Sequence, residues 1–538
     1  MTGKRHPAWT WAAAAALAAP CLLLPAYNPD LFWHLSSGRW IWQNHAVPRV
    51  DFLSFTAAGA AWSDFEWLSQ ALYYAVHRLG GLTALWGLKV LLLLACARLV
   101  DRLLRLHGLP RFFRAAAVVV WSAGMLPHSD IRPELSSLLL FLSMLLLLEK
   151  QRLGRLKASW GPSIGSFLLF AAAANLHAGF IFALMLPAFY ALGELLAGRR
   201  WPRPPVLWGL AGLAGTFCNP YGWGPYVVMF DHLRQRAALS FIQEWQPMTM
   251  TNRFHWPFWA ILAAFLFILH RLRRRPQLPV ALLLASLYFA FSAVAHARMG
   301  AFFFACAVPT GFLLADMAGW LVAAPAAKRA CAACALAYGV FLSATLPRLE
   351  RGVFDHRLVP RQAAEFMAEE SGALLGLRLY SPWEWGGYLG WRLAPWYRVF
   401  WDGRYIFHDR LPEAARASRD ASSWQEYMDD QGLSGALLNN LELRFSTQKA
   451  YPDGSRKEFL RPWYRAYMPS QRWALVYWDP QVLLFVARRA VPASWLAAHE
   501  YRYVRPKDEA AFEEALRLGE IPKAAVAEEE RRHLRETR

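Results

Sequence analysis

Cysteine and acidic residues are scarce in this chain. Its 538 residues include six Cys, and 39 Asp and Glu stand against 58 Lys and Arg. The cysteines all lie in or beside apolar segments, so no disulfide framework can be inferred. The sequence also lacks a Walker motif, a G-x-G-x-x-G loop and a catalytic-triad signature. These absences give no support to a P-loop enzyme, a dinucleotide-binding enzyme or a triad hydrolase.

Apolar residues, by contrast, are abundant, at 56% of the chain. Up to residue 346 they form runs that suit the hydrocarbon core of a bilayer, which takes about 20 residues to cross, or somewhat fewer for short helices. The first run has no clean small-residue cleavage site, which favours a retained helix over a removed signal peptide. We predict eleven membrane spans, near residues 8–26, 82–104, 112–127, 134–149, 162–176, 178–197, 206–219, 257–270, 279–296, 300–320 and 329–346.

The basic residues indicate how these spans are oriented. With eleven spans, the Lys/Arg patches all fall on one side, which the positive-inside rule assigns to the cytoplasm. The N-terminus is then cytoplasmic, and residues 347–538 lie in the periplasm of a bacterial inner-membrane protein. Because the net charge of +19 flanks membrane helices, it gives no reason to expect nucleic acid as a partner. The patches are Lys4-Arg5 and residues 98–114, 150–157, 199–203, 271–275 and 328–329.

The first outward connection, residues 27–81, is too polar for a simple loop. Between residues 28 and 68 it carries four carboxylates, two His and five Trp. Asp30 closely follows the first span, and His34 comes four residues later, so in a helix the two side chains share a face. Asp30 suits either a catalytic carboxylate or a helix cap, whereas Asp51 and Asp64 suit turns or caps.

The other outward connections carry ionisable residues beside aromatic ones. Polar groups at membrane depth usually face a cavity or one another, so we predict one polar cavity at the outer face. Plainer roles stay open: an interfacial position for His177, snorkelling for Arg298, and pairing of Glu244 with Arg234 or Arg236. The candidate residues on these connections are Arg132, His177, Glu244 and Arg298.

Residues 347–538 are typical of a soluble α/β domain. Segments such as ALLGLRLYS and RWALVYWDPQVLLFVAR predict strands, and VPRQAAEFMAEE and SSWQEYMDD predict helices. The paired glycines of WEWGGYLGW permit a sharp turn or a close backbone approach. Trp385 in that stretch and Arg404 in WDGR are candidates for closing the cavity over a substrate. A turn with a local ion pair between Asp402 and Arg404 is the alternative.

Several motifs together point to one family. The first loop has the pattern D-x-x-W/F-H-L-x-x-G-x-x-I, then P-x-x-D-x-x-S-x-T-x-x-G-x-x-W-x-x-x-E-W-L, and IRPELSS, NLHAGF, NPYGW, FIQEW and WEWGGYLGWRLAPWYRVFWDGRYIF follow. With these motifs, over most of its length, the chain resembles the GT-C superfamily of membrane glycosyltransferases. That superfamily includes protein O-mannosyltransferases, aminoarabinose transferases of lipid A and oligosaccharyltransferases. The chain departs from the mannosyltransferases at Asp30-Leu31, where those enzymes have two adjacent acids.

The resemblance implies both a fold and a reaction. The fold would be that of a mainly α membrane protein, with a GT-C-like bundle of about 11 transmembrane helices over residues 1–346 and an extracytoplasmic α/β domain over residues 347–538. The reaction would move a sugar, with inversion, from a polyprenyl-phosphate donor to a hydroxyl of a lipid, glycan or protein acceptor at the outer face.

The resemblance also implies roles for the candidate residues. Asp30 would be the general base, Glu66 would orient the acceptor, and His34 would assist. Arginine suits the departing phosphate because a planar guanidinium can bind it through two hydrogen bonds. No cofactor is predicted, and no ligand spacing indicates a metal, although Asp30 with Glu66 leaves a divalent metal open. The substrate-binding set comprises Arg132, His177, Glu244, Arg298, Trp385 and Arg404.

Two other functions stay open. A transporter or flippase of a lipid-linked saccharide would place its charges near the middle of the membrane, often on broken or repeated helices, whereas here they gather at one face. A non-catalytic scaffold subunit of a cell-envelope glycan pathway would keep the fold without needing a base. The presence of Asp30 favours an enzyme.

Overall fold

The computed structural model describes residues 9–156, 160–198, 202–275, 278–321 and 352–537. The chain forms two compact units. The helical unit comprises the described parts of Met1–Asn28, Ile41–Val47 and Ser63–Asp355, and the sheet unit those of Pro29–Trp40, Pro48–Trp62 and His356–Arg538. Two pieces of the first loop thus belong to the sheet unit, whereas the sequence analysis grouped the whole loop with the apolar helices.

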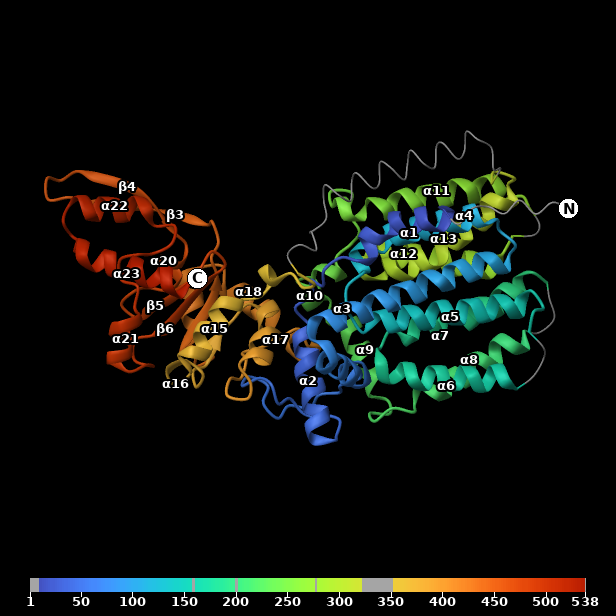
Figure 1. Cartoon of the computed structure of the whole chain (residues 1–538), viewed down its shortest axis with the longest axis horizontal. Coiled ribbons are helices and arrows are strands. Elements are labelled where there is room, and N and C mark those ends of the chain that lie inside the picture. Colours follow the sequence, from blue (N-terminus) through green and yellow to red (C-terminus); the bar gives the residue numbers. More distant parts are fainter. Residues whose placement is uncertain (1–8, 157–159, 199–201, 276–277, 322–351, 538) are drawn as a thin grey trace. The chain divides into compact units, whose positions relative to one another are not determined.

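The helical unit is a bundle of mostly antiparallel helices joined by short connections (Figure 1). Its core is almost wholly aliphatic and aromatic, with Trp121, Phe141 and Phe180 fully buried. The α-helices are α1 (Trp9–Leu22), α3 (Trp67–Leu106), α4 (Arg111–Gly124), α5 (Glu134–Arg152), α6 (Gly161–Leu176), α7 (Phe180–Leu196), α8 (Arg203–Thr216), α9 (Gly224–Arg234), α10 (Arg236–Leu239), α11 (Trp256–Leu272), α12 (Val280–Ala295) and α13 (Gly300–Met317). Short 3₁₀ turns are η1 (Leu126–His128), η2 (Gln243–Trp245), η3 (Arg253–His255) and η4 (Ala297–Met299).

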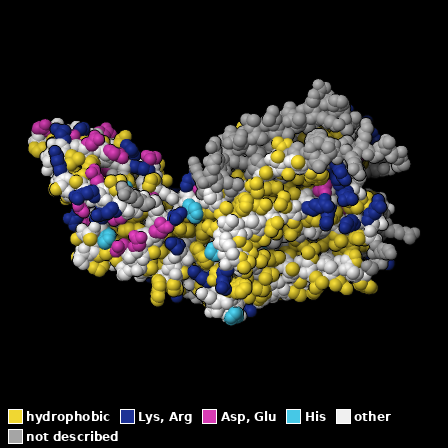
Figure 2. Space-filling model, in the orientation of Figure 1, with side chains coloured by type: hydrophobic (Ala, Val, Ile, Leu, Met, Phe, Trp, Pro, Cys, Tyr) yellow, Lys and Arg dark blue, Asp and Glu magenta, His cyan; other side chains and the backbone are white. Residues whose placement is uncertain are grey.

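The apolar segments are helical wherever the structure describes them. Three helical stretches are long and apolar enough to cross a membrane, namely Trp67–Leu106, Arg253–Leu272 and Ala297–Met317, and three more apolar helices are shorter. The predicted count of eleven spans therefore stays a prediction, and the segment 329–346 lies outside the described residues. Figure 2 shows a broad apolar surface over these helices, with Lys and Arg gathered beyond one end of it. Such a surface is typical of a bundle embedded in lipid.

Helix α3 is interrupted by a kink at two adjacent glycines. Gly80 and Gly81 have non-helical backbone angles, and Gly81 has a φ of 61°. That left-handed conformation costs glycine little because it has no Cβ. The predicted second span, near residues 82–104, lies within α3 and starts directly after this kink.

The sheet unit contains a four-stranded mixed sheet in the order β1-β2-β6-β5. Strand β1 (Leu379–Tyr380) is parallel to β2 (Gly435–Asn439), while β6 (Val482–Ala487) is antiparallel to both β2 and β5 (Trp473–Trp478). The runs WALVYW and VLLFVA in β5 and β6 are almost entirely buried, as continuous apolar strands should be. A separate hairpin joins β3 (Arg444–Ala450) to β4 (Arg456–Pro462).

Short helices surround these strands (Figure 1). The predicted α/β character of the C-terminal region is therefore present in the structure. Helix α2 (Leu31–Asn44) begins in the sheet unit and ends in the helical unit. The others are α15 (Arg361–Glu369), α16 (Ser371–Leu374), α17 (Trp383–Arg392), α18 (Arg410–Ala417), α19 (Ala421–Asp430), α20 (Tyr464–Tyr467), α21 (Ala493–His499), α22 (Glu509–Arg517) and α23 (Lys523–Glu536), with 3₁₀ turns η6 (His356–Leu358) and η7 (Tyr405–Phe407).

Candidate active site

The sheet unit holds a buried charge cluster, which we call the Arg404 clamp: Arg404, Asp402 and Asp51. Arg404 Nε lies 2.8 Å from Asp402 Oδ1, and its Nη2 lies 2.8 Å from Asp402 Oδ2 and 2.6 Å from Asp51 Oδ1. The residue as a whole is 1% exposed. Burial alone would lower the pKa of the Arg404 guanidinium, but the two carboxylates outweigh it and raise that pKa above its ordinary value. The cation is therefore permanently charged, and its Nε and Nη2 atoms are engaged by the two carboxylates, while Nη1 is buried without a hydrogen-bond partner in the described part of the chain.

The Arg404 clamp fixes a distant part of the first loop. Asp51 also accepts hydrogen bonds from the backbone N–H of Ser54 (3.1 Å) and from its hydroxyl (2.6 Å), which is the Asx-type turn expected of an aspartate in DFLS. The guanidinium carbon of Arg404 lies 4.6 Å from the ring centroid of Trp62, within cation–π range. Both ends of the segment Pro48–Trp62 are thus held against the WDGR turn.

Asp30 lies directly before α2, and the same WDGR turn contacts its carboxylate. A Cβ built on Gly403 would overlap Oδ1 of Asp30 and would also crowd Nε1 of Trp33. Glycine is needed here because of this close approach, not because of an unusual backbone angle. The backbone N–H of His34 donates to the Asp30 carbonyl at 3.2 Å, so the two residues have the predicted helical spacing. His34 itself is buried.

Two of the predicted substrate-binding residues are buried within the sheet unit. Trp385 is 3% exposed, and a Cβ on its neighbour Gly386 would overlap the carbonyl oxygen of Trp401. Arg404 forms the local ion pair with Asp402 that was the alternative for WDGR, and it pairs with Asp51 as well. Its binding of a leaving phosphate stays a prediction. The side chain of Trp385 is packed into this unit, and its closing over a substrate stays a prediction.

The helical unit holds a second cluster, which we call the Arg298 ladder. Arg298 Nη1 lies 2.8 Å from Glu244 Oε1, its Nε lies 3.4 Å from Glu134 Oε2, and its Nη2 lies 3.4 Å from His177 Nε2. Glu244 forms a further ion pair with Arg132, and His177 lies 3.5 Å from Glu66. The ladder therefore joins three carboxylates, two guanidiniums and one imidazole.

The local sequence places the members of the ladder at helix ends, except Glu244, which lies within the 3₁₀ turn η2. Glu66 precedes α3, Arg132 and Glu134 flank the start of α5, and His177 caps α6. Arg298 lies in η4 directly before α13. Charged side chains at such helix ends avoid the hydrocarbon-facing middle of the bundle, where they would be costly.

The position of the His177 proton follows from its neighbours. The Nδ1 atom accepts the Gly179 backbone N–H at 3.0 Å and lies 2.9 Å from the Ser137 hydroxyl oxygen. A neutral ring with Nδ1 as acceptor carries its proton on Nε2, and this nitrogen lies 3.5 Å from Oε1 of Glu66. The 3.4 Å contact between Arg298 Nη2 and the same nitrogen then joins two donors and is not a hydrogen bond. A Cβ on Gly179 would lie 2.8 Å from both Nδ1 and the Ser137 oxygen, so NLHAGF needs a glycine at this position.

The Arg298 ladder is only partly buried. The side chains of Arg132, Glu244 and Arg298 are 29%, 27% and 23% exposed. Burial alone would raise the pKa of the Glu244 carboxyl, but Arg132 and Arg298 outweigh it and lower that pKa to about 2. A cluster of this kind can bind an anion at its guanidiniums and can accept or donate a proton at its carboxylates and imidazole.

The structure confirms some predicted neighbours and supplies others that were missed. Within the helical unit it brings together Glu66, Arg132, His177, Glu244 and Arg298, all of which were predicted. Glu244 pairs with Arg132 and Arg298. The side chain of Arg236, one of the alternatives left open by the sequence, lies outside the described part of the chain. Glu134 was missed, although its position in IRPELSS, two residues after Arg132, was an available signal.

Asp130 is a structural residue of the same connection. Its carboxylate accepts the backbone N–H groups of Tyr27 (2.9 Å) and Ile131 (2.6 Å) and is buried. Burial raises the pKa of this carboxyl, and the backbone donors only partly oppose that shift. Among the described residues, no group of three or more His, Cys, Asp and Glu is arranged to hold a metal ion.

Comparison with solved structures shows a shared fold. The chain superposes on an oligosaccharyltransferase from Archaeoglobus fulgidus, in a complex with zinc and sulfate, with a TM-score of 0.53 and 12% identity over 91% of this chain and 80% of that one. ArnT from Cupriavidus metallidurans in the apo state gives a TM-score of 0.48 and 14% identity over 90% of this chain and 98% of that one. Neither a protein-family model nor a curated protein sequence matches the chain. The chain therefore shares its overall fold with the Archaeoglobus fulgidus oligosaccharyltransferase.

Proposed function

We propose that this protein is a membrane glycosyltransferase that moves a sugar from a polyprenyl-phosphate-linked donor to an acceptor hydroxyl, with Asp30 as general base. The observation that carries the proposal is the Arg298 ladder, a partly exposed set of carboxylates and guanidiniums at the helix ends of a GT-C fold. A scaffold subunit would have no need to keep so many charges at helix ends, because each is costly near a membrane.

The proposed reaction forms one bond and breaks another. The Asp30 carboxylate accepts the proton of the acceptor hydroxyl as its oxygen attacks the anomeric carbon of the donor. The bond from that carbon to the phosphate oxygen breaks, and polyprenyl phosphate leaves with the electron pair. Attack from the face opposite the leaving group inverts the anomeric centre.

The charge that develops on the leaving phosphate needs a cationic partner, because it is released in a low-dielectric surrounding. Arg132 and Arg298 are proposed for this task, since both are partly exposed and both can offer paired N–H donors. Glu66 is proposed to orient the acceptor, and the His177 Nε2 proton directed at Glu66 would keep its carboxylate in place. The proposal assigns no divalent metal to the ladder.

The Arg404 clamp is proposed to position the base. Gly403 contacts Asp30 directly, and Arg404 ties the same turn to Asp51. The reaction is faster with a positioned carboxylate than with a mobile one, because the reacting atoms must meet at near-attack distances. The clamp thus acts through Asp30 and not on the substrate.

The test uses the full chain purified into lipid nanodiscs. Radiolabelled polyprenyl-phosphate sugars are offered with acceptor extracts, and wild type is compared with Asp30→Asn. Asp231→Asn is the control, since Asp231 is exposed and lies on α9 outside both clusters. The expected result is transfer by wild type and by the control, and a loss of about 10²–10⁴-fold in Asp30→Asn, the usual effect of removing a general base.

Three results separate the alternatives. Equal transfer by wild type and Asp30→Asn would remove Asp30 from the mechanism. Equal binding of the lipid by both proteins without turnover would favour the scaffold subunit. Movement of an unaltered donor between leaflets of a proteoliposome would favour the flippase. Melting temperatures of all variants establish that any loss is not due to unfolding.

A further inference from the structure

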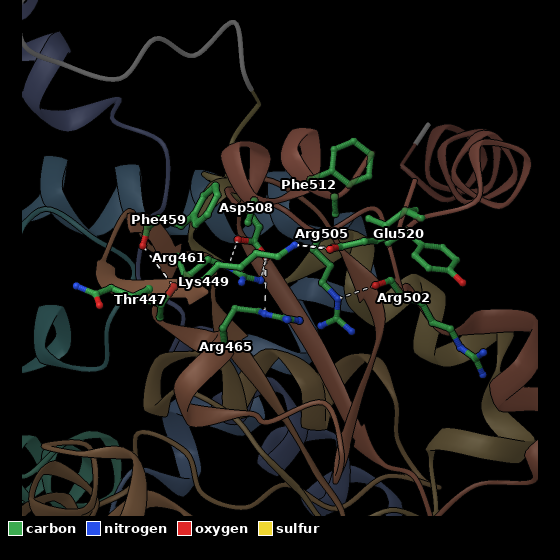
Figure 3. Close-up of a pocket in the computed structure, with 15 residues that line it drawn as sticks. Thr447, Lys449, Phe459, Arg461, Arg465, Arg502, Arg505, Asp508, Phe512 and Glu520 are labelled. Atoms are coloured by element: carbon green, nitrogen blue, oxygen red, sulfur yellow. Dashed lines mark hydrogen bonds and ion pairs between the residues drawn. The ribbon is translucent and has the colours of Figure 1, made fainter. Parts of the chain in front are cut away.

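A basic cavity lies in the sheet unit, on residues outside both the Arg404 clamp and the Asp30 turn. It has a volume of about 480 Å³ and is bounded by the β3–β4 hairpin, α20, α22 and the segment between residues 502 and 508. Figure 3 shows its charged side chains converging from these elements. The cavity is large enough for one or two sugar rings, since ligand pockets start at about 300 Å³.

The lining is strongly basic. Lys449, Arg461, Arg465, Arg502 and Arg505 line the cavity, against two carboxylates, Asp508 and Glu520. These carboxylates already have partners: Arg461 Nε lies 2.6 Å from Asp508, and Lys449 Nζ lies 2.6 Å from Glu520. The remaining arginines therefore carry positive charge that the lining itself does not balance.

Arg465 and Arg505 carry most of that excess. Arg465 Nε is 3.7 Å from Asp508, which is already bound by Arg461. Among the described residues Arg505 has no carboxylate within ion-pair distance, and its Nε donates to the Arg502 carbonyl at 3.2 Å. Arg502, in contrast, is 58% exposed, is bonded to Glu500, and is directed away from the other arginines (Figure 3).

Like charges that are held together in a half-buried site lower one another's pKa when both are cations. Burial and the neighbouring Arg465 lower the pKa of Arg505 to about 10, and burial and Arg461 lower the pKa of Arg465. Two protonated guanidiniums in this position carry an electrostatic cost that a bound anion would relieve. Arginine is also the side chain best shaped for a phosphate or a carboxylate, because its N–H groups form a fork.

The walls of the cavity are aromatic and polar. Phe459, Phe512 and Tyr503 line it together with Thr447 and Gln448. Aromatic faces offer an apolar surface to a flat ligand, while the hydroxyl and amide groups suit a ligand with many hydroxyls. A bare inorganic anion would leave most of this space unfilled.

We infer that this basic cavity is a binding site for an anionic saccharide, with Arg465 and Arg505 holding its phosphate or carboxylate group and the aromatic residues contacting its rings. The site is separate from the residues proposed for sugar transfer. It would let the protein hold a charged glycan. Substitutions in the cavity should therefore weaken glycan binding without removing the residues proposed for catalysis.

The test measures binding to the full-length protein in nanodiscs of zwitterionic lipid by isothermal titration calorimetry. The probes are glucose 1-phosphate, glucuronate, inorganic phosphate and glucose, so that phosphate and carboxylate sources are separated from each other and from the neutral sugar. The variants are Arg505→Gln and Arg465→Gln. Arg531→Gln is the matched control, since Arg531 is 69% exposed on α23 and does not line the cavity.

At least one charged sugar should bind, and each cavity variant should weaken it by about tenfold, the effect of losing one charge-assisted hydrogen bond. The control should bind like wild type, and glucose should not bind. The inference is overturned if neither charged sugar binds, or if Arg531→Gln weakens binding as much as Arg505→Gln. Inorganic phosphate binding as tightly as both sugars would overturn the saccharide assignment. Should Arg505→Gln fail to fold, Arg465→Gln provides the same comparison.

Discussion

The Arg404 clamp and the Arg298 ladder use the same chemical groups in opposite ways. In the clamp one guanidinium meets two carboxylates, and all three side chains are at most 1% exposed. In the ladder one guanidinium also meets two carboxylates, but Arg298 and Glu244 are 23% and 27% exposed. The clamp is closed off from solvent, whereas the ladder has donors that a ligand can reach.

This difference in exposure suits the clamp to positioning chain segments and the ladder to binding a ligand. A buried charge that is paired with carboxylates contributes by fixing the chain segments it joins, and here those segments are 353 residues apart in the sequence (404 against 51). A partly exposed charge network can exchange one of its internal partners for a substrate group. Exposure, not residue type, therefore decides which arginine is a candidate for phosphate.

The largest effect is expected from breaking the clamp. Arg404→Met would leave Asp51 and Asp402 buried without their cation, and removing one partner of a buried ion pair typically costs about 3–5 kcal/mol. Urea or thermal unfolding of the full protein in nanodiscs measures the loss. Arg361→Met is the control, because Arg361 is 55% exposed and its pair with Glu365 should be worth at most about 0.5 kcal/mol. Similar losses in both variants would contradict the clamp.

A smaller effect, confined to rate, is expected from the glycine that touches Asp30. In Gly403→Ala the new Cβ would overlap Asp30 Oδ1, so the carboxylate must move. A shift of this kind in a catalytic group can cost about 10²-fold in turnover. Gly376→Ala is the control, since a Cβ there meets nothing within 4 Å. The proposal requires that kcat falls in Gly403→Ala while the melting temperature of this variant stays close to that of Gly376→Ala.

The sequence was informative about elements and much less so about pairings. Apolar runs located the helices, because composition is a local property. The partner of Arg404 could not be found in this way: Asp402 is next to it, but Asp51 is joined only by the folded chain. The sequence consequently treated Arg404 and Arg298 alike, and only their burial distinguishes them.

Glu134 was missed for a related reason. IRPELSS was recognised as a motif, yet its carboxylate was not included among the predicted site residues. Its contact with Arg298 links residues 164 positions apart (298 against 134), which no spacing rule within a helix or strand predicts.

Neutralising Glu244 should have an intermediate effect on stability. Glu244→Gln leaves Arg132 and Arg298 without their shared anion, but both are partly exposed, so solvent compensates and we expect a loss of about 1–2 kcal/mol. Because the guanidiniums would then repel each other, added phosphate should restore part of the melting temperature in Glu244→Gln and have little effect in Asp231→Asn. Equal responses of the two variants to phosphate would argue against anion binding at the ladder.

The smallest effect near neutral pH concerns how the stability of the fold depends on the protonation of Glu244. It is also the sharpest test of the contrast in exposure. Its pKa is lowered in the folded state from an ordinary value of 4.5 to about 2. A lowered carboxyl pKa stabilises the fold above the unfolded value, and this contribution is lost as the pH falls. Wild type should therefore lose stability between about pH 4.5 and pH 2 through this group, while Glu244→Gln should lack that component. The difference in melting temperature between the two proteins should be constant from pH 8 to pH 6 and should shrink as the pH falls below the unfolded pKa. A difference in melting temperature that persists at acid pH would mean that Glu244 stabilises the fold through packing and not through the charges of Arg132 and Arg298.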